Sequence, residues 1–162
     1  MNEIPEILER YRRGAELVAV AITGAAGPEL DFKSAPDKWS VRQIVAHLAD
    51  TEAVTVSRFR SMIAEDNPAM VPFDQKAWAE RTDYANRKPS QALETMRHLR
   101  ADNYALLNGL PEETFSRTGT HSRRGPMTLL DMVRLMAEHA EKHATQIRNI
   151  RAEYKASRQR PA

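Results

Sequence analysis

The chain has 162 residues, with 24 lysines and arginines against 22 aspartates and glutamates, which gives a net charge of +2. Because the two signs are interspersed, this small excess gives no support for a nucleic-acid-binding protein, and we expect no nucleic-acid partner. The absence of cysteine excludes disulfides and excludes a protein thiolate as a nucleophile or metal ligand.

The length suits a single domain over residues 1–162, with a tail expected to fray from about residue 155. The first residues are acidic where a signal peptide would be basic. The longest apolar run, near residues 17–26, is too short to cross a bilayer. We therefore expect a cytoplasmic protein with no membrane partner.

The first half of the chain predicts two amphipathic helices. The first begins near Ile4, accommodates Pro5 in its first turn and ends around Gly24. The second begins with a capping box formed by Ser40 and Gln43.

The second half predicts a short helix capped by Asp74 and then two more long helices. The third long helix has Ser90 as its expected N-cap and ends at Gly109, and the fourth has Thr128 as N-cap with Asp131 completing a capping box. No segment shows the period-two alternation of a half-buried strand. The sequence therefore predicts an all-α fold, most simply a four-helix bundle.

Two histidines in the fourth helix, His139 and His143, are four residues apart and so lie on the same face. That face is otherwise apolar, with His143 inside it and His139 at its edge. A single inward histidine is usually a hydrogen-bonded core residue, but two stacked imidazoles would both need partners and would repel each other if protonated. A shared cation meets both requirements, so the pair is half of a candidate metal site.

A third imidazole is available at His47, at the edge of the apolar face of the second helix. Three protein ligands leave one position on the metal open, which is typical of catalytic rather than structural sites. His98 is expected on a polar face and His121 in a turn, so neither is a candidate ligand.

Two charged residues, Glu52 and Arg100, are expected in the centres of the apolar faces of the second and third helices. One interpretation is a buried ion pair that fixes the register of the helices. The other makes Glu52 a general base or a group supporting the metal ligands, and Arg100 an anchor for an anionic substrate. The sequence leaves both interpretations open.

Three blocks of the sequence together resemble the DinB-like (YfiT) superfamily of metal-dependent enzymes, which is unrelated to the polymerase that shares the name. They are residues 38–52 (KWSVRQIVAHLADTE), 73–78 (FDQKAW) and 138–147 (EHAEKHATQI). The resemblance covers nearly the whole chain. It implies a four-helix bundle that binds a divalent metal, commonly zinc or nickel, through His47, His139 and His143.

The resemblance also implies an activity, because characterised members include thiol S-transferases and a thiol-dependent maleylpyruvate isomerase. We expect first a metal-dependent transferase in which a low-molecular-weight thiol co-substrate attacks a small electrophilic molecule. The alternatives are a metal-dependent hydrolase, in which water attacks, and a non-catalytic metal-binding scaffold of the stress response. We also expect a small-molecule substrate and a homodimeric assembly.

Overall fold

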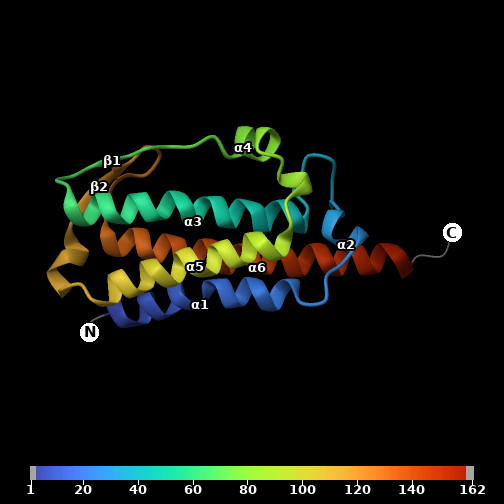
Figure 1. Cartoon of the computed structure of the whole chain (residues 1–162), viewed down its shortest axis with the longest axis horizontal. Coiled ribbons are helices and arrows are strands. Elements are labelled where there is room, and N and C mark those ends of the chain that lie inside the picture. The colour runs from blue at the N-terminus through green and yellow to red at the C-terminus, as the bar shows by residue number, and fades with distance from the viewer. Residues whose placement is uncertain (1–2, 160–162) are drawn as a thin grey trace.

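The computed structural model describes residues 3–159, which are mostly helical, and confirms the predicted four-helix bundle. The long helices are α1 (Ile4–Ile22), α3 (Val41–Ala64), α5 (Pro89–Asn108) and α6 (Leu129–Gln159). Helices α1 and α6 run in one direction along the bundle and α3 and α5 in the other (Figure 1). Helix α6 continues through the segment where we expected fraying, and residues 160–162 lie outside the described residues.

The helices are not arranged in chain order around the bundle. Helix α1 packs mainly against α6 and α5, and α3 packs mainly against α5 and α6. The consecutive long helices α1 and α3 are therefore diagonal to each other. This arrangement makes α3 and α6 antiparallel neighbours (Figure 1), which brings the segment after Ser40 next to the middle of the last helix.

Most helix ends follow the predicted signals. Ser40 and Gln43 form the capping box of α3, and Thr128 and Asp131 exchange the equivalent bonds at the start of α6. Gly24 adopts a φ of 77° just after α1, a conformation that favours glycine. The prediction of Ser90 as an N-cap is wrong, because α5 already begins at Pro89 and its N-cap, Lys88, makes no side-chain bond.

Short elements connect the bundle helices. The helix capped by Asp74 is present as α4 (Gln75–Arg81), and α2 (Pro28–Asp31), η1 (Tyr84–Asn86) and η2 (Glu112–Ser116) are additional. A small sheet joins β1 (Ala69–Met70), β2 (Thr118–His121) and β3 (Gly125–Thr128), with β1 parallel and β3 antiparallel to β2. These strands have two to four residues, too few for an alternating pattern to be recognised in the sequence.

The bundle core contains two large apolar clusters separated by a polar layer, and a third, small cluster of Ala46, Ala79 and Tyr84 lies between α3, α4 and η1. One cluster includes Val18, Ile44 and Ile147, and the other includes Phe59, Leu107 and Met132. Between them along the bundle lie the buried polar side chains of Glu52, Arg100 and Asn103. Burial of such groups is costly unless they are paired, so the layer must be internally bonded.

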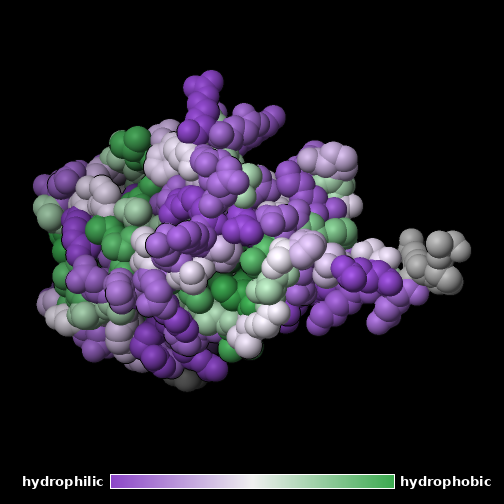
Figure 2. Space-filling view, turned by 45° about the vertical axis from the view of Figure 1, so that its right-hand side comes forward, coloured by the Kyte–Doolittle hydropathy of each residue, from purple (hydrophilic) through white to green (hydrophobic). Residues whose placement is uncertain are grey.

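The outside of the bundle is largely polar. Figure 2 shows hydrophilic side chains over most of one face, with small hydrophobic areas between them. Within residues 3–159, no helix has the length and apolar character needed to cross a membrane.

The capping box of α3 provides a test of helix-end energetics. Ser40→Ala should lower the free energy of unfolding by about 1 kcal/mol, because the backbone N–H of Gln43 loses the Ser40 hydroxyl as its acceptor. Ser90→Ala is the matched control and should change stability far less, since Ser90 is exposed and caps no helix. Urea denaturation of the two variants compares them, and equal losses would contradict the assignment of the caps.

Candidate metal centre

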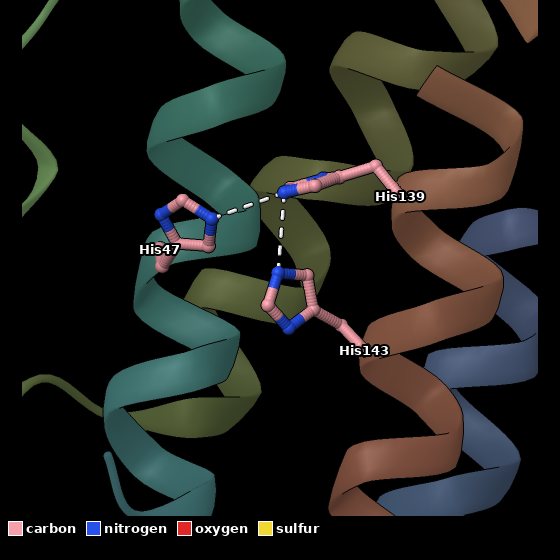
Figure 3. Close-up of side chains that lie close together, drawn as sticks. All are labelled: His47, His139 and His143. Atoms are coloured by element: carbon pink, nitrogen blue, oxygen red, sulfur yellow. Dashed lines mark hydrogen bonds between the residues drawn. The ribbon is translucent and has the colours of Figure 1, made fainter. Parts of the chain in front are cut away.

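Three imidazoles from two helices meet between α3 and α6. His47 extends from α3, while His139 and His143 extend from successive turns of α6 (Figure 3). The Nε2 atom of His139 lies 3.1 Å from Nε2 of His47 and 3.1 Å from Nε2 of His143. Each helix turns these positions inward because they continue an apolar face, as the sequence predicted.

The spacing of these nitrogens fits a single cation. One ligand atom from each histidine lies within 4.8 Å of the others. Two nitrogens bound to one tetrahedral zinc ion at about 2.0–2.1 Å lie about 3.4 Å apart, close to the observed separations. Among residues 3–159, no fourth histidine or carboxylate joins this group. The donor set therefore fits a divalent transition metal.

The three imidazoles differ in exposure. His47 is 1% exposed, whereas His139 and His143 are only partly buried. The Trp39 ring packs on His47 with ring centroids 4.9 Å apart and contributes to its burial. The accessible atoms of the cluster therefore belong mainly to the two histidines of α6.

Two polar neighbours orient the imidazoles. Nδ1 of His143 lies 2.8 Å from Oε1 of Gln146, so it can donate its proton there and leave Nε2 free to bind a metal. Nδ1 of His47 lies 3.4 Å from the Thr51 hydroxyl. Nδ1 of His139 is buried without a partner among the described residues. This role of Gln146 was not predicted from the sequence, although its position one turn after His143 could have indicated it.

The environment keeps the three rings neutral, which is the form that binds metals. Burial, reinforced by His143, lowers the pKa of His47 to about 4. Burial, with contributions from His143 and His47, lowers the pKa of His139 to about 2. Burial also lowers the pKa of His143.

Glu52 and Arg100 form the buried ion pair that was one of the two interpretations. Nε and Nη2 of Arg100 donate to Oε2 of Glu52 at 3.0 and 2.8 Å, and both side chains are almost completely inaccessible. The hydroxyl of Tyr11 and the amide of Asn103 donate to Oε1 of the same carboxylate. Glu52 thus has all the partners that a buried carboxylate requires.

Arg100, which belongs to α5, forms hydrogen bonds with each of the other three bundle helices. From α5, its guanidinium donates to Glu52 of α3, to the carbonyl of Tyr11 in α1 at 2.9 Å and to the carbonyl of Met136 in α6 at 3.3 Å. Gly14 of α1 makes room for it, because a Cβ there would overlap Nη1 of Arg100 and lie 2.8 Å from Cβ of Ala140. Neither Tyr11 nor Gly14 was predicted from the sequence to take part in this layer.

The remaining histidines lie outside the cluster. His98 is on the surface with 81% of its side chain exposed, beside Glu94. His121 ends β2, where its Nδ1 accepts backbone N–H groups of the following turn. Neither belongs to the metal cluster, in agreement with the sequence analysis.

Comparison with known proteins identifies the family. Residues 10–147 match the model of the DinB superfamily, which is most of the chain. The chain belongs to the DinB superfamily. Among DinB proteins it is 33% identical to YfiT of Bacillus subtilis over 120 residues, covering 74% of this chain and 67% of YfiT. It is also 28% identical to a Geobacillus kaustophilus protein over 93% of this chain and 85% of that protein. Both relatives are named as metal-dependent hydrolases.

Solved structures place this DinB chain in the same fold. The structure of YfiT, which is described as an unusual four-helix bundle, matches 96% of this chain and 90% of its own with a TM-score of 0.89 and 26% identity. A mycothiol-dependent maleylpyruvate isomerase matches 89% of this chain and 60% of its own, with a TM-score of 0.72. Its identity is 14%, so this likeness extends to the fold alone.

Replacement of either Glu52 or Arg100 alone should strongly destabilise the protein. Glu52→Leu or Arg100→Met alone should lower the free energy of unfolding by about 3–5 kcal/mol, because each leaves an unpaired buried charge. The double variant should recover much of that loss in urea denaturation. As a control, Arg12→Met at the exposed Arg12–Glu9 pair should change stability by less than about 1 kcal/mol. Strictly additive losses for the buried pair would show that the two residues do not interact.

Metal binding should depend on the cluster and on pH. The protein, purified without a histidine tag, should bind close to one divalent transition-metal ion per chain, as measured by elemental analysis. His143→Ala should lose most of it, whereas His98→Ala, at an exposed position, should retain it. Full metal content in His143→Ala would exclude this site.

The lowered pKa values set the direction of the pH dependence. Protons should displace the metal only well below the ordinary histidine pKa of about 6.5, so we expect retention at about pH 6 and release near pH 4 in equilibrium dialysis. In the metal-free protein, the unfolded chain takes up protons first as the pH falls. The free energy of unfolding of the metal-free protein should therefore decrease as the pH falls below about 6.5. Release already near pH 6.5 would contradict the burial of the rings.

Proposed function

We propose that this protein is a metal-dependent hydrolase in which His47, His139 and His143 hold one divalent metal, with zinc or nickel the expected ions. The observation that carries the proposal is the convergence of three Nε2 atoms of neutral, buried or half-buried imidazoles. Three-histidine sets with no fourth protein ligand are typical of catalytic metals. A divalent ion held in this way supplies a nucleophile near neutral pH by lowering the pKa of water.

Hydrolysis is favoured over thiol transfer by the relatives. The proteins that match this chain at 28–33% identity are named as hydrolases, whereas the thiol-dependent isomerase shares the fold at 14% identity. The thiol transferase, our first expectation from the sequence, is therefore the alternative that the experiment must separate.

The other residues of the site have positioning roles in this proposal. Gln146 holds the His143 ring with Nε2 toward the cluster, and Trp39 shields His47 from water. Glu52 and Arg100 have no exposed atoms to offer a substrate, so they act by holding α3 and α6 in register. The substrate in this proposal is a small molecule that reaches the cluster at the half-buried His139 and His143, and the expected assembly is a homodimer.

Activity should require the metal and the cluster but no thiol. We expect one of a panel of small esters, amides and phosphoesters to be hydrolysed in thiol-free buffer by the zinc- or nickel-loaded protein. Chelation should abolish turnover, and His139→Ala should reduce kcat/KM by about 100-fold or more. His98→Ala, which alters an exposed histidine outside the cluster, should leave turnover unchanged.

Mass spectrometry of the products separates the two reactions. Two products whose masses add up to that of the substrate plus one water support hydrolysis. A product that gains the mass of an added thiol, with no turnover in its absence, would replace the hydrolase by the transferase. A protein that binds metal fully yet turns over none of the panel with or without thiols would favour the scaffold.

A further inference from the structure

Two cavities lie between α3 and the segment that links β1 to α4, and the smaller one also borders the turn of the β2–β3 hairpin. Figure 1 shows that segment running along α3. The larger has a volume of about 290 Å³ and is mainly apolar, with Val71, Phe73 and Trp78 among its lining residues. The smaller, of about 80 Å³, has a mixed polar and apolar lining that includes His121 and Arg123. Arg58, Pro72 and Phe73 line both, so the two cavities adjoin.

Arg58 is the only charged side chain lining both cavities, and its charge has no acidic partner. Its Nη2 donates to the carbonyl of Val71 at 2.9 Å, and its guanidinium carbon lies 6.0 Å from the centre of the Phe73 ring. Its Nε is buried without an acceptor, and within the described part of the chain no carboxylate pairs with this arginine. Burial also lowers the pKa of Arg58. Among the described residues the guanidinium thus makes one hydrogen bond and no ion pair, so an anionic acceptor in the adjoining cavities would stabilise its charge.

The hairpin adds further positive character at the smaller cavity. Nδ1 of His121 accepts the backbone N–H groups of Arg123 at 3.1 Å and Arg124 at 3.3 Å. In the neutral ring its Nε2 therefore carries the proton and is able to donate. Asp74 lines a neighbouring groove together with Arg123, but its Oδ1 accepts from Ala77 to cap α4.

We propose that these cavities form a binding site for a small carboxylic acid with an apolar, preferably aromatic, body. The carboxylate lies between Arg58, His121 and Arg123, where a guanidinium offers paired donors that match its geometry. The body packs against Phe73 and Trp78 in the larger cavity, whose volume is near the lower end for small-ligand sites. Arg58 is about 16 Å along α3 from His47, so the site is separate from the metal cluster and does not depend on the proposed hydrolase activity.

Calorimetric titration with phenylacetate and with its neutral amide, phenylacetamide, tests this site on the intact protein. Phenylacetate should bind at least tenfold more tightly than the amide, because only the charged group meets the unpaired guanidinium. Arg58→Gln and Arg123→Gln should each weaken phenylacetate binding by about tenfold or more. Arg13→Gln, which removes the same charge from an exposed position on α1, is the matched control and should have no effect.

Further titrations identify where the carboxylate binds. His143→Ala should leave the affinity for phenylacetate unchanged, since the metal cluster takes no part. Loss of binding in His143→Ala but not in Arg58→Gln would place the carboxylate at the metal and overturn the proposal. Equal binding of acid and amide would overturn it without any variant, even if Arg58→Gln failed to fold.

Inorganic phosphate and a second copy of the chain are two other occupants of these cavities, and each would give a different experimental result. Inorganic phosphate that binds as tightly as phenylacetate, with the same dependence on Arg58, would show a general anion site and overturn the role of the apolar cavity. A second copy of the chain could instead cover the cavity through Val71, which is 76% exposed. Sedimentation run alongside the titrations tests this, and a dimer that binds no phenylacetate would overturn the proposal.

Discussion

The buried guanidinium of Arg100 is the constraint on which the rest of the bundle depends. A charge at this depth is tolerated only when its donors are paired, and the partners of Arg100 come from all three of the other long helices. Apolar packing alone allows helices to slide past one another by small steps, because hydrophobic contacts are not directional. Hydrogen bonds from one planar group are directional, so this residue specifies a single register for four helices.

The geometry of the metal cluster depends on that register. Arg100 is bonded to Glu52 of α3 and to the carbonyl of Met136, which lies one turn before His139 in α6. The same layer therefore sets the height of α3 against α6, and the three imidazoles converge only at that height. Metal ligands on facing helices need placement to within fractions of an ångström, which a polar layer next to them provides. In return, a cation shared by α3 and α6 would reinforce this helix pair.

The sequence predicted those parts of the structure that depend on local signals or on periodicity. Proline, glycine and capping residues located most helix ends, and the apolar faces correctly turned His139 and His143 inward. Ser90 was misassigned because Pro89 already fits the first turn, so two start signals competed. The small sheet and the part played by Tyr11 were missed because both depend on contacts between distant segments. Gln146 was overlooked although a local, one-turn spacing links it to His143.

Gly14 shows how such a layer restricts the evolution of the protein. Its missing side chain is the space that the Arg100 guanidinium occupies, and Ala140 closes the same space from α6. A larger residue at position 14 is compatible with the fold only if the guanidinium at position 100 gives way to a smaller group, and an uncharged replacement there leaves Glu52 without its counter-charge. We therefore expect Gly14, Glu52 and Arg100, although far apart in the chain, to be retained or replaced together among related sequences.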